Sequence, residues 1–114
     1  MSEMLTIVKQ LGHLSRDLDE AVNKLADLEF IAVEAEGDFK VAFAGCFREA
    51  VGSVEDRKQI AITQTDTLWR TFGKAAAAVR LQKEHIKALH ARIDVGRTIQ
   101  STARAEMQLA GGQL

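Results

Sequence analysis

The stretch LGHLSRDLDEAVNKLADL, residues 11–28, decides the fold, because leucine or alanine recurs in it at alternating steps of three and four residues. The same spacing extends back to Met4 and forward to Cys46. Apolar residues at the first and fourth positions of a seven-residue repeat lie along one side of an α-helix and can pack against a partner helix. The sequence therefore predicts a helix over about residues 3–50 with a coiled-coil-like apolar seam.

A second helix with the same repeat is predicted over about residues 54–109, after a tight turn at residues 51–53. Gly52 suits the left-handed conformation that follows a helix, and Ser53 is a typical N-cap. The chain contains no proline to stop either helix early. Threonines at positions 63, 65, 67 and 71 are poor helix formers and leave room for a local break near Asp66, with Asp66 as a new cap. Residues 111–114 are expected to form a frayed tail.

These elements predict an all-α fold, a single domain over residues 1–110 built as a long antiparallel helical hairpin. The residues expected in its seam are Leu11, Leu18, Leu25, Leu28, Phe39, Leu68, Phe72, Val79, Ile86, Leu89 and Ile93. Two helices that meet along one strip bury little apolar surface per residue, and Phe30, Ile31, Ile62 and Ile99 lie outside the seam. We therefore expect a homo-oligomer, either a dimer that forms a four-helix bundle or a larger assembly.

Composition excludes several classes of protein. Cys46 is the single cysteine, so no intramolecular disulfide or thiolate metal cluster forms. The start of the chain does not resemble a signal peptide, and no apolar window is long enough to span a membrane, so we expect a cytoplasmic protein. His85 and His90 are five residues apart, which does not suit a shared metal ion. Phosphate-binding glycine loops and nucleophile motifs are missing, so we expect no enzyme, cofactor or small-molecule substrate.

Charge is distributed unevenly despite a net charge of -1. Residues 1–52 carry 5 basic and 10 acidic side chains, whereas residues 53–114 carry 10 basic and 6 acidic ones. In the second helix Lys83, Arg97 and Arg104 share one position of the repeat with His90, and Arg80 and Lys87 fall in the neighbouring column. Such a row of cations can neutralise several phosphates of a nucleic acid. The alternative is that the row is solvated or pairs with acids of the first helix.

Arg57 and Lys58 follow the predicted turn and are candidates for a second nucleic-acid contact. They could equally pair with Glu55 or Asp56, which lie in the same first turn of the second helix.

Two short motifs carry a resemblance to a known family. They are GSVEDRK at residues 52–58 and LHARIDVGRTIQS at residues 89–101, followed by RAEM at residues 104–107. The region from about residue 40 to 107 resembles small all-helical proteins encoded by bacteriophages of actinobacteria and other Gram-positive hosts. Genes of that family lie among those for replication and recombination, near single-strand-binding proteins, recombinases and nucleases. The resemblance implies an accessory role in DNA metabolism in the host cytoplasm, and it supplies no catalytic residues.

Together these features predict a non-enzymatic, phage-type accessory protein of DNA replication or recombination. It would contact single-stranded DNA, or a protein bound to it, through the basic row. The alternatives are a helical protein–protein interaction module that binds or inhibits a host or phage protein, and a structural virion or scaffold component.

Overall fold

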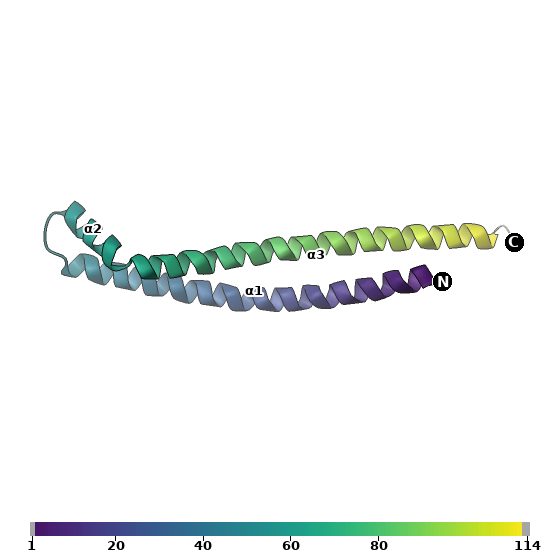
Figure 1. Ribbon diagram of the computed structural model, residues 1–114, viewed down its shortest axis with the longest axis horizontal. Coiled ribbons are helices and arrows are strands. Elements are labelled where there is room, and N and C mark those ends of the chain that lie inside the picture. Colours follow the sequence, from purple (N-terminus) through teal and green to yellow (C-terminus); the bar gives the residue numbers. More distant parts are fainter. Residues whose placement is uncertain (1, 113–114) are drawn as a thin grey trace. The chain divides into compact units, whose positions relative to one another are not determined.

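The computed structural model describes residues 2–112, and over these residues the chain is all-helical (Figure 1). Helix α1 spans Ser2–Glu49, α2 spans Val54–Gln64 and α3 spans Asp66–Gly112. A long helix pairs against another, so the predicted all-α class and the pairing of long helices are confirmed. Of the expected tail, Gly111 and Gly112 complete α3, and residues 113–114 lie outside the described residues.

The chain divides into two units, each of which contains parts of α1 and α3. We call residues 1–23 together with 83–114 the terminal unit, and residues 24–82 the turn unit. Within each unit α1 runs antiparallel to α3, and the turn unit also contains α2 (Figure 1).

The terminal unit has a thin core along one seam. Leu89 and Ile93 of α3 and Ala21 of α1 are buried. Gly96 lies against Leu11, where an added Cβ would come 2.7 Å from Leu11 Cδ2. The absence of a side chain at residue 96 therefore allows the two helices to approach closely at this level.

Aromatic rings form the centre of the turn unit. Phe39 of α1 stacks against Phe72 of α3, with ring centroids 6.4 Å apart. Phe43 and Phe47 continue the row along α1 at spacings of four residues, with centroid distances of 6.0 and 6.5 Å. The buried hydrophobic residues of this unit are Ala35 and Ala61, both small. The large apolar side chains are therefore mostly only partly covered.

The turn between α1 and α2 has local signals that account for its position. Gly52 has a φ of +130°, which side chains rarely tolerate, and Ser53 Oγ accepts a hydrogen bond of 3.1 Å from the Asp56 backbone N–H. Arg57 of α2 connects the start of that helix to the end of α1 across the turn. Its Nε and Nη2 donate to the Phe47 carbonyl oxygen at 3.2 and 3.0 Å, and its guanidinium lies 4.5 Å from the Phe47 ring centroid.

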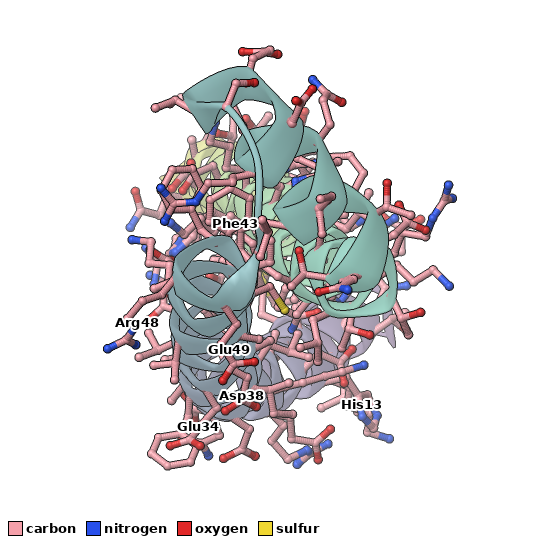
Figure 2. The ribbon with its side chains drawn as sticks, turned by 90° about the vertical axis from the view of Figure 1, so that its left-hand side faces the viewer. His13, Glu34, Asp38, Phe43, Arg48 and Glu49 are labelled. Carbon is pink, nitrogen blue, oxygen red and sulfur yellow. The ribbon has the colours of Figure 1, made fainter. Side chains whose placement is uncertain are left out.

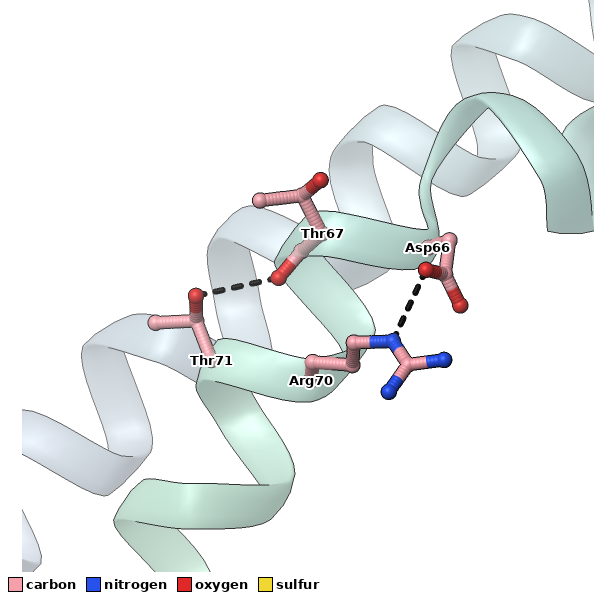
Figure 3. A network of polar contacts seen from close by, with 4 residues as sticks. All are labelled: Asp66, Thr67, Arg70 and Thr71. Atoms are coloured by element: carbon pink, nitrogen blue, oxygen red, sulfur yellow. Dashed lines mark hydrogen bonds and ion pairs between the residues drawn. The ribbon is translucent and has the colours of Figure 1, made fainter.

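The single helix expected over residues 54–109 is interrupted at Thr65. Thr65 has φ −107° and ψ 12°, and α3 begins at Asp66, which is therefore the first helical residue rather than the cap. Thr65 is buried, and its hydroxyl donates to the Ala61 carbonyl oxygen at 2.7 Å. Figure 3 shows the first turn of α3, where Asp66 accepts from Arg70 Nε at 2.8 Å and the Thr71 hydroxyl donates to the Thr67 carbonyl oxygen at 3.0 Å. Side chains that bond to the backbone in this way compete with regular helix geometry and bend helices.

Most of the residues expected in the seam are at least partly buried. Leu89 and Ile93 are buried, and Leu11, Leu18, Leu25, Leu28, Phe39, Phe72, Val79 and Ile86 are partly buried. Leu68 differs, because 36% of it is exposed and it borders a surface hollow of the turn unit.

Candidate nucleic-acid interface

The candidate interface lies on α3 within the terminal unit. Leu89 and Ile93 of α3 are buried there and Gly96 lies against Leu11 of α1, whereas the exposed sides of α3 carry charged residues together with apolar ones such as Val95 and Ile99. Lys83, Lys87, Arg97 and Arg104 are all exposed. We call these four residues the basic stripe.

Helical geometry places the stripe on one flank of α3. Arg97 and Arg104 are seven residues apart, about 10 Å along the axis at 1.5 Å per residue, and they point in nearly the same direction. A shallow hollow of about 230 Å³ in the same unit is lined in part by Met4, Ala103 and Glu106, and no residue of the stripe lines it.

The two arginines of the stripe make no ion pair with the carboxylates that the structure describes. Within the described residues, neither Arg97 nor Arg104 has a carboxylate oxygen within 4.0 Å. The repeat position of α1 that matches the stripe is held in this unit by Val8, Ser15 and Val22, which carry no charge. Arg97 and Arg104 therefore have no acidic neighbour in the matching column of α1.

The two lysines of the stripe differ from the arginines. Lys87 Nζ lies 3.3 Å from Glu84 Oε1, but both side chains are more than two-thirds exposed, so the pair adds little stability and can exchange for another anion. Lys83 is exposed as well, and it already interacts with another residue of the chain. Asp94 also falls on the stripe side of α3, three residues before Arg97, and reduces the positive charge there.

The other sequence candidates belong to the turn unit. Arg80 is exposed on α3 and has no ion pair within the described residues. Lys58 is exposed on α2. Arg57 is partly buried and bonds to the Phe47 carbonyl oxygen rather than to Glu55 or Asp56. This gives Arg57 a structural role in closing the turn, which the local sequence did not reveal because Phe47 is ten residues away.

Two surface hollows in the turn unit were not anticipated from the sequence. One, of about 320 Å³, is lined by Phe39, Phe43, Ile62, Thr65, Asp66 and Trp69. The other, of about 430 Å³, lies between α1 and α3 and includes Phe30, Ile31, Glu34, Asp38, Leu68 and Thr71. The only sequence signal for them was the presence of aromatic and β-branched residues outside the seam.

Residues 2–112 offer neither a metal-binding cluster nor a membrane-spanning helix. These residues contain no cluster of three or more histidine, cysteine, aspartate or glutamate side chains that could hold a metal ion. The helices described include none with enough length and apolar character to cross a bilayer. Cys46 is a free, partly buried cysteine in the seam of α1.

Comparison of the chain with protein-family models, with curated proteins and with solved structures found no match in any of the three.

Proposed function

We propose that this chain is a non-enzymatic, oligomeric accessory protein of phage-type DNA replication or recombination, active in the host cytoplasm. Its basic stripe would bind single-stranded DNA or the acidic surface of a protein already bound to that DNA. The observation that carries the proposal is the pair Arg97 and Arg104, exposed on one side of α3 and free of ion pairs with described carboxylates.

The proposed contact is electrostatic and independent of base sequence. A cation that reaches a phosphate releases a condensed counterion, which favours binding most strongly at low salt. Aromatic side chains would be needed to stack bases, and Trp69, the one tryptophan, belongs to the turn unit rather than to the stripe. A homo-oligomer would present several stripes at once, so weak contacts would combine into useful affinity.

The test is binding of a fluorescent single-stranded oligonucleotide by the full chain between about 50 and 200 mM salt. The triple variant Lys87→Ala/Arg97→Ala/Arg104→Ala removes three cations from the stripe. It should bind more weakly and lower the salt slope by about 2, because each phosphate contact contributes roughly 0.7 on single strands. Asp94→Asn should bind more tightly, since it removes an anion from the same side.

Arg92→Ala is the matched control, because Arg92 is an exposed arginine of α3 that points away from the stripe. It should retain the affinity and the salt slope of the unmodified protein. If the triple variant and Arg92→Ala behave alike, or if binding is independent of salt, the proposed contact is wrong.

A second candidate function is a helical protein–protein interaction module. It is favoured by large apolar side chains of the turn unit that face solvent, such as Phe30 at 68% exposed and Val41 at 75%. A module of this kind would keep its partner in pull-down experiments when the stripe is replaced, whereas a DNA-binding protein would lose its ligand.

A further inference from the structure

One flank of the turn unit is apolar, hollowed and open. Ile31 is 54% exposed, and Phe30 is more exposed still. With Leu68 of α3 they border the hollow of about 430 Å³ between α1 and α3. We call this side of the turn unit, around Phe30, Ile31 and Leu68, the open flank.

The open flank carries both signs of charge. Glu34 and Asp38 of α1 border the hollow, and Figure 2 shows them extending outward from that helix. Lys74 follows Thr71, another residue of the hollow, by one helical turn on α3, so it lies on the same side. Lys24 precedes Ile31 by two turns on α1 and also shares this side.

These charges are not neutralised within the part of the chain that the structure describes. None of the four side chains, Lys24, Glu34, Asp38 and Lys74, has an ion-pair partner within 4.0 Å among residues 2–112. Acids lie mainly on the α1 side of the flank and Lys74 on the α3 side. A surface with both signs separated in this way is complementary to a rotated copy of itself, as a twofold interface requires.

The large apolar side chains of the open flank are accessible to such an interface. Phe30 is 68% exposed, Ile31 54% and Leu68 36%. The buried hydrophobic residues of the turn unit, Ala35 and Ala61, are both small, and a core this thin usually gains stability from self-association. A second copy on the open flank would bury large side chains that the turn unit leaves exposed on its own.

We propose that the open flank binds the open flank of a second copy of this chain. Phe30 and Ile31 of each copy enter the hollow of the other, and Lys24 and Lys74 of each copy pair with Glu34 and Asp38 of the other. This interface rests on the oligomeric part of the proposed function and specifies its surface.

The test uses two charge-reversed proteins, each purified alone. The first, Glu34→Lys/Asp38→Lys, has only cations at the four positions, and the second, Lys24→Glu/Lys74→Glu, has only anions. Light scattering should show the unmodified chain as a dimer and each variant as a monomer, because like charges then face each other. An equimolar mixture should restore a dimer containing one copy of each, since every contact is again between opposite charges.

Two sets of controls separate this interface from general charge or surface effects. Glu55→Lys and Lys58→Glu reverse exposed charges of α2 and should leave the dimer intact. Ile31→Asp should dissociate the dimer, whereas Val33→Asp should not, because Val33 is also exposed but its direction on α1 differs by about 160° from that of Ile31. Circular dichroism of every variant establishes that it remains helical.

Three results would overturn the proposal. These are a monomeric unmodified chain, reversed variants that still dimerise alone, or a mixture that stays monomeric although both proteins are helical. The first would also contradict the oligomeric part of the proposed function, whereas the other two concern this surface alone. Failure of this interface can be distinguished from failure of DNA binding. The variants that test DNA binding change the stripe of the terminal unit, and their effect is measured as binding of the oligonucleotide.

Discussion

At the scale of single residues, Gly96 shows how one missing side chain positions a helix. A Cβ at residue 96 would lie 3.4 Å from Cγ of Leu11 and only 2.7 Å from its Cδ2, and the second distance is closer than such atoms normally approach. Gly12, in the same unit, has no such neighbour within 4 Å. Alanine is favoured over glycine in a helix by about 1 kcal/mol when nothing else changes. The two glycines therefore differ in packing and not in helix propensity.

We expect Gly12→Ala to stabilise the protein by up to about 1 kcal/mol and Gly96→Ala to gain less or to destabilise it, because Leu11 must move. Urea unfolding at one protein concentration measures both. Adding Leu11→Ala should remove the penalty specific to residue 96, which a double-mutant cycle would detect. Equal effects of the two glycine substitutions would show that the close approach does not matter.

At the scale of elements, the junction of α1 and α2 depends on a contact across the turn. Gly52 and Ser53 end one helix and begin the next, but they do not determine the angle between them. Arg57 connects the two by donating twice to the Phe47 carbonyl oxygen near the end of α1 while lying over the Phe47 ring. Because this carbonyl belongs to the last turn of α1, Arg57 also satisfies a group that helix geometry leaves without a partner.

Arg57→Ala should therefore destabilise the protein by about 2 kcal/mol, since hydrogen bonds from a charged donor contribute roughly 1.5–3 kcal/mol. Arg57→Lys should recover little of this loss, because an ammonium group cannot reproduce the paired donors of a guanidinium. Lys58→Ala is the control and should have almost no effect, as Lys58 is exposed. Thermal unfolding followed by circular dichroism gives the comparison. A neutral Arg57→Ala would contradict the assigned role.

At the scale of the whole molecule, stability should depend on self-association. Among the described residues, three of the five buried hydrophobic residues are alanines, whereas many large apolar side chains stay open to solvent. A thin core of this kind usually needs a partner to be stable. Association that occurs only in the folded state raises the apparent stability as protein concentration rises.

The melting temperature of the unmodified chain should therefore increase with protein concentration. The variant Glu34→Lys/Asp38→Lys should melt lower and show no such dependence, because its flank repels a second copy. An equimolar mixture of this variant with Lys24→Glu/Lys74→Glu should again show a melting temperature that increases with protein concentration. Differential scanning calorimetry over a wide range of concentrations makes the measurement, and a constant melting temperature for the unmodified chain would contradict it.

Residues close together in sequence made the helices predictable. The seven-residue repeat in 11–28 and its continuation specify which side of each helix is apolar, and Gly52 and Ser53 signal the end of one helix and the start of the next. The threonine-rich segment also pointed to the interruption that occurs at Thr65. The bond between Arg57 and Phe47 could not be predicted, because it depends on how the chain folds back after the turn.

The sequence by itself therefore determined the helical class, the apolar side of each helix and the candidate cations of the stripe. Only the tertiary structure decided that Arg97 and Arg104 make no ion pair with a carboxylate of residues 2–112, and that Ile31, Glu34 and Leu68 meet around one hollow. The physical reason is the register between α1 and α3. Sliding one helix along the other by seven residues leaves the apolar seam almost unchanged, yet it changes every neighbour on the flanks.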